Sequence, residues 1–169
     1  GYELINGIKI NCWKYQTTHG SQTLRQALMN SCNPALMQLG KRIGAQTLYK
    51  YYEAFGLFDK TGIATSGEAN SYFWDLDDVG PIELATMSFG QRFRVTPIQL
   101  ITAVSSVANN GVLVEPRIVK QVENPDTGAI TSIESTNVRQ VISKETSDEL
   151  MNMLESVVTE GTGRYGQVK

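Results

Sequence analysis

The sequence predicts an α+β fold that is predominantly helical. Apolar residues recur at helical spacing through most of the 169 residues, whereas strand-like runs are confined to two short hairpins. Because two short hairpins cannot make a stable sheet by themselves, we expect helices to form the body of the chain.

The two hairpins are predicted from their turns. The first spans residues 2–10 and turns at Asn6-Gly7, a pair that accepts positive φ at both central positions. The second pairs residues 117–123 with residues 129–134 across a Pro- and Gly-containing turn at residues 124–128.

Three helices are expected in the first third of the chain, over residues 21–30, 33–44 and 45–55. Ser21 is the predicted cap of the first helix. Asn33 followed by Pro34 predicts an N-cap and a first-turn proline for the second helix, which Gly44 can end.

Residues 57–80 show no clear periodicity and predict a long surface loop. Three more helices are expected, beginning at Pro81, after the capping box that starts at Thr96, and after Ser143. The tail at residues 162–169 is polar and is expected to join no core.

Composition and charge exclude several classes of function. The 15 basic and 17 acidic residues give a net charge of −2, without the basic surplus that nucleic-acid binding requires. No apolar run approaches the roughly 20 residues of a membrane span. One His and two Cys are too few for a conventional structural zinc site, which takes about four ligands, so we expect no metal and no other cofactor.

Few residues stand out as candidates for chemistry. His19 is the only histidine; it lies in a loop and no Gly-x-Ser-x-Gly motif accompanies it, so an exposed or cap-region residue is expected rather than a catalytic one. Ser31-Cys32-Asn33 lies between two predicted helices. A purely structural role would explain both polar residues, with Ser31 as a hydroxyl at a helix end and Asn33 as an N-cap. Ser-x-Asn is a weak pattern, and Ser135-Thr136-Asn137 also matches it.

Longer runs give Ser31-Cys32-Asn33 a context, and they cover residues 24–35, 82–91, 95–100, 109–111 with Pro116, and 160–163. Together these runs resemble the transpeptidase domain of class B penicillin-binding proteins, of the type found in Gram-positive cell division and sporulation. The resemblance covers nearly the whole chain. It implies the β-lactamase-like α+β fold and serine acyl transfer around three motifs: Ser-x-x-Lys, Ser-x-Asn and Lys-Thr-Gly.

The resemblance implies roles for only a few residues here. Ser31 would relay a proton and Asn33 would bind the substrate, with Gln91 and Thr162 as weaker substrate-binding candidates. No serine has a lysine three residues later, so the Ser-x-x-Lys motif is not found. The nearest match, Thr47-Leu48-Tyr49-Lys50, lies within a predicted helix and is not assigned to the motif. Lys60-Thr61-Gly62 spells the third motif, but it lies in a loop soon after Asn33 and is rejected.

Residues 1–169 are therefore expected to be the central portion of a transpeptidase domain, with the first motif before Gly1 and the third after Lys169. Most of the central antiparallel sheet would be lacking, and apolar helix faces would be exposed or paired with another copy. Without the nucleophile, this chain alone is expected to be inactive.

For the full-length protein, the resemblance implies cross-linking of peptidoglycan stem peptides and acylation by β-lactams. It also implies that the full-length protein is anchored in the membrane, acts on the extracytoplasmic face of that membrane and belongs to a cell-wall synthesis complex. Two alternatives remain open: a β-lactam sensor domain, which uses the same Ser-x-Asn region, and a helical interaction domain without chemistry.

Cys12 and Cys32 are a candidate redox pair if the domain works outside the cytoplasmic membrane, where disulfides persist. A bridge would tether the Ser31-Cys32-Asn33 motif to the N-terminal hairpin. The alternative is a small buried residue at Cys32 and a strand-end residue at Cys12.

Overall fold

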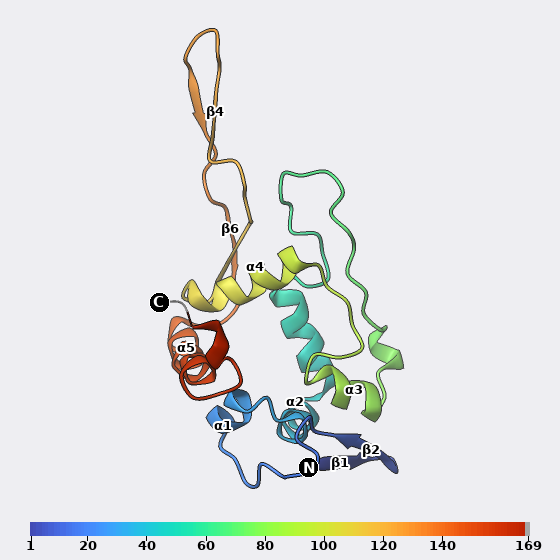
Figure 1. Ribbon diagram of the computed structural model, residues 1–169. Coiled ribbons are helices and arrows are strands. Elements are labelled where there is room, and N and C mark those ends of the chain that lie inside the picture. The colour runs from blue at the N-terminus through green and yellow to red at the C-terminus, as the bar shows by residue number, and fades with distance from the viewer. Residues whose placement is uncertain (168–169) are drawn as a thin grey trace. The chain divides into compact units, whose positions relative to one another are not determined.

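The computed structural model describes residues 1–167 (Figure 1). Helices account for about 41% and strands for about 14% of the chain, which confirms the predominantly helical α+β prediction. The elements in chain order are β1 (Tyr2–Ile5), β2 (Ile8–Asn11), α1 (Leu24–Met29), α2 (Asn33–Ala54), η1 (Leu76–Asp78), α3 (Pro81–Met87), α4 (Pro97–Ala108), β3 (Val112–Val114), β4 (Gln121–Glu123), β5 (Ile130–Ser132), β6 (Asn137–Gln140), α5 (Lys144–Thr159) and η2 (Arg164–Gly166).

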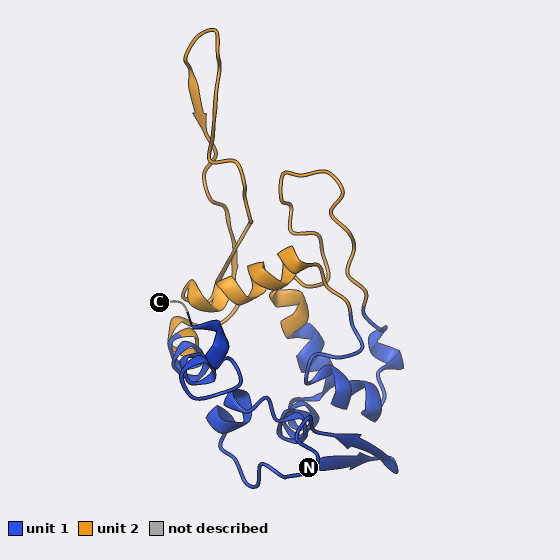
Figure 2. Ribbon diagram, in the orientation of Figure 1, with its two compact units in different colours: residues 1–50, 73–93, 148–169 blue, residues 51–72, 94–147 orange. Residues whose placement is uncertain are grey.

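The chain divides into two compact units, coloured separately in Figure 2. Unit 1 comprises residues 1–50, 73–93 and 148–169, and it holds the first hairpin, α1, most of α2, α3 and most of α5. Unit 2 comprises residues 51–72 and 94–147, and it holds α4 and the strands β3–β6.

The strands form three antiparallel pairs, and no larger sheet occurs within residues 1–167. β1 pairs with β2 across a turn in which Asn6 and Gly7 have φ of 49° and 80°, as predicted. β4 and β5 form the second predicted hairpin. The pairing of β3 with β6 was not predicted, because the whole β4–β5 hairpin separates its two strands.

Helix α1 begins two residues later than predicted. The Gln26 N–H donates to the Thr23 hydroxyl (3.3 Å), and the Thr23 N–H donates to the Gln26 side chain (2.9 Å). This reciprocal capping box needs Gln or Glu three residues after the cap. Thr23 has that partner, whereas the residue three positions after Ser21 is Leu24, so the Ser21 prediction was wrong.

Helix α2 contains the predicted interruption at Gly44, whose φ is 78° and ψ is 162°. Its start differs from the prediction by one residue. The Leu36 N–H donates to the Cys32 carbonyl (3.1 Å), so Cys32 is the N-cap and Asn33 is the first helical residue. Pro34 fits this first turn, where its missing N–H would have no helical partner.

Close packing in unit 1 joins α2 to α3. Gly40 is buried in α2, and a Cβ at this position would overlap the Ser88 hydroxyl that follows α3. The neighbouring core includes Met37 and Met87, each about 1% exposed. A glycine is therefore required for this approach of the two helices.

Helix α4 organises unit 2 through the predicted capping box at Thr96 and Gln99. The Gln99 side chain is 1% exposed, and its Nε2 donates to the carbonyls of Leu57 (3.3 Å) and Asp59 (2.7 Å). This side chain thus fixes the start of the long loop. The cap of α5 is also confirmed, because the Thr146 N–H donates to the Ser143 hydroxyl (3.2 Å).

One face of α4 is bare. Leu100, Ile101 and Val104 are each more than half exposed, as expected for a helix face without a partner. None of the described helices is long and apolar enough to cross a membrane.

Candidate active site

Ser31 occupies a backbone position that usually belongs to glycine. Its φ is 49°, its N–H donates to the Leu28 carbonyl (3.0 Å), and the Cys32 N–H donates to the Ala27 carbonyl (2.9 Å). These two bonds form the Schellman motif, which ends a helix with a residue in the left-handed conformation. A residue with a side chain costs about 1–2 kcal/mol there, so this serine is held at the expense of stability.

The Ser31 hydroxyl is available to an outside partner. The residue is exposed, and its Oγ makes no hydrogen bond to any of residues 1–167. A hydroxyl can donate one proton and accept another, which is the property a proton relay requires.

Asn33 supplies an amide two residues after Ser31. Because Cys32 serves as the N-cap, the Asn33 side chain is not used for capping, and its Nδ2 donates instead to the Asn11 carbonyl after β2 (3.2 Å). Within the described residues, the other amide hydrogen and the carbonyl oxygen stay free. An amide with a donor and an acceptor is suited to binding a peptide group.

The turn at residues 30–33 between α1 and α2, called the Ser31 turn below, is held by hydrogen bonds from two sides. The Trp13 indole donates to the Asn30 carbonyl (2.9 Å), while the N–H and hydroxyl of Thr162 both approach the Met29 carbonyl (3.1 and 3.4 Å). A Cβ at Gly161 would overlap that same Met29 oxygen. The tail was expected to join no core, and none of residues 162–167 is buried, but its first residue satisfies a carbonyl left open at the end of α1.

A second contact joins α1 to α5. The Arg25 guanidinium donates to the Asn152 carbonyl (2.6 Å) and to the Ser156 hydroxyl (2.7 Å). Charge-assisted bonds of this kind are among the stronger ones in proteins. The position of the Ser31 turn therefore depends on α5.

Gln91 is less closely connected. It is exposed after α3, and its N–H donates to the Thr86 carbonyl (3.0 Å) beyond Gly90, which has a φ of 88°. No hydrogen bond among residues 1–167 links Gln91 to Ser31 or Asn33. Of the predicted substrate-binding residues, the structure therefore brings Asn33 and Thr162 to the turn, but not Gln91.

The turn also places His19 beside Cys12 and Cys32, the candidate redox pair, and the sequence did not indicate this approach of the histidine. Cys12 and Cys32 are free, buried thiols, and the Cys12 Sγ lies 3.7 Å from the His19 Nδ1. The ligand atoms of all three lie within 4.8 Å of one another. The His19 ring also meets the Trp13 ring at 5.5 Å. Burial, with the charge of Lys14 as a smaller cause, lowers the pKa of His19.

His19 was expected to be an exposed or cap-region residue; it does lie in the loop before the Thr23 cap, but it is not exposed. The ring is partly buried against the two cysteines. A lone histidine in an irregular loop gives no periodic signal, so only the folded loop reveals the cluster.

The rejected Lys60-Thr61-Gly62 sequence lies in a loop, as expected. The N–H and hydroxyl of Thr61 both donate to the Glu68 carboxylate (2.7 and 2.8 Å). Burial raises the pKa of Glu68, but these hydrogen bonds outweigh it and the pKa lies below its usual value. The polar groups of Thr61 are thus engaged within the loop.

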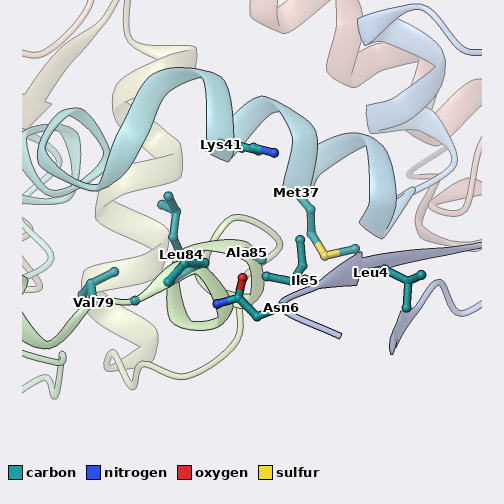
Figure 3. A pocket seen from close by; sticks show the side chains of 10 residues that line it. Leu4, Ile5, Asn6, Met37, Lys41, Val79, Leu84 and Ala85 are labelled. Atoms are coloured by element: carbon teal, nitrogen blue, oxygen red, sulfur yellow. The ribbon is translucent and has the colours of Figure 1, made fainter. Parts of the chain in front are cut away.

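A cavity of about 440 Å³ lies elsewhere in unit 1, between the first hairpin, α2 and α3. Figure 3 shows Met37 and Lys41 of α2 beside it, with Leu84 of α3 and Ile5 and Asn6 of the hairpin. Its lining is mainly apolar and includes no residue of the Ser31 turn. This cavity is therefore separate from the candidate site at the Ser31 turn.

Comparison with known proteins shows the family of this chain. Residues 2–169 match the family described as penicillin binding protein transpeptidase domain. The chain is 44% identical over 170 residues to Stage V sporulation protein D of Bacillus subtilis (strain 168), covering all of this chain and 26% of that protein. It is 32% identical to penicillin-binding protein PbpB of Mycolicibacterium smegmatis over 146 residues, covering 82% of this chain and 22% of that protein.

Solved structures agree with the sequences. The crystal structure of apo penicillin binding protein 3 from Mycobacterium tuberculosis superposes with a TM-score of 0.88 at 27% identity, covering 99% of this chain and 39% of that one. The chain spans about a quarter of the length of the curated relatives named above. It belongs to the penicillin-binding protein transpeptidase domain family.

Proposed function

We propose that this chain is the Ser-x-Asn portion of a peptidoglycan D,D-transpeptidase. The observation that carries the proposal is the turn itself, where the hydroxyl of Ser31 is free at a costly backbone position and the Asn33 amide keeps one N–H and its carbonyl oxygen free among the described residues. Relatives named peptidoglycan D,D-transpeptidase PbpA support this reaction; one from Mycobacterium tuberculosis is 30% identical over 137 residues.

The proposed reaction is serine acyl transfer. A nucleophilic serine adds to the carbonyl of a D-Ala-D-Ala end, the C–N bond breaks, and the terminal D-Ala leaves with a relayed proton. Ser31 relays that proton, and Asn33 binds an amide of the stem peptide. An acceptor amine on a second stem peptide then takes the acyl group and completes the cross-link.

The nucleophile, its lysine and the Lys-Thr-Gly strand belong, in this proposal, to segments outside residues 1–169. Those segments also complete the central sheet and cover the bare face of α4, which could otherwise pair with a second copy. No cofactor takes part in this route.

The full-length protein is proposed to be anchored in the membrane and to work on its extracytoplasmic face, within a cell-wall synthesis complex. The likeness to Stage V sporulation protein D favours a role in sporulation. Solved relatives in complex with aztreonam and ampicillin support β-lactams as ligands.

Labelling with a fluorescent penicillin tests the proposal. The full-length protein is expected to be labelled covalently, whereas the 169-residue chain alone is expected to fold without being labelled. Covalent labelling of a residue within this chain alone would contradict the placement of the nucleophile outside it. A full-length protein that is acylated but cannot join stem peptides would be a β-lactam receptor instead.

A further inference from the structure

Three metal-binding side chains converge beside the Ser31 turn. Cys12 follows β2, His19 lies in the next loop, and Cys32 is the N-cap of α2. The Cys12 Sγ and His19 Nδ1 are 3.7 Å apart, and all three ligand atoms lie within 4.8 Å of one another. All three residues belong to unit 1.

These distances suit a tetrahedral site. Zinc binds sulfur at about 2.3 Å and nitrogen at about 2.0–2.1 Å, so neighbouring ligand atoms stand roughly 3.6–3.8 Å apart. The pair Cys12 and His19 already has this spacing. The remaining separations need to close by no more than about 1 Å, which small side-chain rotations can supply.

Burial and charge also favour a bound cation. Cys12 is 2% and Cys32 is 6% exposed, so a bound ion would be shielded from competing water on the thiol side. Two thiolates neutralise a divalent ion, and the N-terminus of α2 favours negative charge at Cys32. Lys14 is nearby and opposes a bare cation, but it does not oppose the neutral complex.

We propose that Cys12, His19 and Cys32 form a three-ligand site for a thiophilic divalent cation, with zinc as the expected occupant. Two thiols release their protons to solvent, two S–Zn bonds and one N–Zn bond form, and a water fills the fourth position. A mixed set of two thiolates and an imidazole suits zinc. The ion would clamp the end of β2 and the following loop onto the turn that carries Ser31.

The test uses the reduced full-length protein, titrated with zinc against a chromophoric chelator and with cobalt as a spectroscopic substitute. We expect one tight site and a thiolate-to-cobalt charge-transfer band. Loss of an outer-shell partner already costs 10–100-fold in metal affinity, so His19→Ala should weaken binding by at least about 100-fold. The matched control Lys14→Ala keeps all three ligands and should bind at least as tightly as the wild type.

A second measurement avoids substituting the buried cysteines. Bound zinc should slow the alkylation of Cys12 and Cys32 in the wild type below the rate that burial alone allows once a chelator has removed the ion. Absence of the band, absence of protection, or unchanged affinity in His19→Ala would each overturn the site. The site does not require Ser31 to be catalytic, so penicillin labelling separates its failure from failure of the proposed function.

Discussion

Replacing Ser31 with glycine is expected to stabilise the fold of the protein while slowing its acylation by penicillin. Ser31 has a φ of 49°, where a residue with a side chain costs about 1–2 kcal/mol. Glycine removes that cost but loses about 0.5–1 kcal/mol through the greater freedom of the unfolded chain. The net gain expected for Ser31→Gly is therefore about 0.5–1 kcal/mol.

Ser31→Ala is the matched comparison, because it also removes the hydroxyl but keeps the backbone cost. It should gain no stability. Both variants should slow acylation by roughly 100-fold or more, since general acid–base groups typically contribute at least that factor. The contrast separates the hydroxyl's chemistry from its effect on the backbone.

Urea denaturation and fluorescent penicillin acylation of the full-length variants measure the two effects. Asn110, which follows α4 with a φ of 55°, provides a control outside the site. Asn110→Gly should give a smaller stabilisation, because asparagine tolerates this conformation, and should leave acylation unchanged. The reasoning fails if Ser31→Gly is no more stable than Ser31→Ala, or if it is acylated at the wild-type rate.

Gly161→Ala should place its Cβ against the carbonyl that ends α1, destabilise the protein by about 1–3 kcal/mol and slow acylation. Gly166→Ala, where an added Cβ meets no atom of residues 1–167, should change neither stability nor acylation, and equal urea midpoints of the two variants would refute this. The pKa of Glu68 is lowered by folding, so its stabilisation is complete above its usual value of 4.5 and is lost as the pH falls through the folded pKa. Glu68→Gln should remove that part of the acid dependence of the urea midpoint, and an unchanged dependence would contradict the assignment. Oxidised glutathione, which takes up two electrons as Cys12 and Cys32 form a disulfide, should slow acylation until a thiol reductant is added. The bridge is ruled out if neither reagent changes acylation of the wild type, or if oxidised glutathione also slows acylation of Cys12→Ser.

Local signals accounted for much of the fold. The turn at Asn6-Gly7, the break at Gly44 and the capping box at Thr96 each depend on residues a few positions apart, and all three were predicted. The β3–β6 pair and the contact of Thr162 with α1 join distant segments, so no local pattern encodes them. These contacts depend on which surfaces remain open once the local elements have formed.

The candidate site was predictable only in part. Ser31 and Asn33 were chosen through a family resemblance, but their conformations were not apparent from the sequence. Because Cys32 is the N-cap, the Asn33 side chain does not cap the helix and donates to the Asn11 carbonyl instead. The prediction placed the cap one residue later because asparagine is a favoured cap and cysteine is not. The approach of His19 to the cysteines depends on an irregular loop and was missed for that reason.

The most direct test of the proposed function compares Asn33→Ala with Ser135→Ala in the full-length protein, by the rate of acylation with a fluorescent penicillin. Both positions belong to Ser-x-Asn sequences, but only Asn33 lies at the braced turn. Loss of one substrate hydrogen bond, worth about 1.4 kcal/mol, should slow acylation of Asn33→Ala at least about tenfold. Ser135→Ala should react at the wild-type rate, and equal effects of the two substitutions would contradict the assignment of the site.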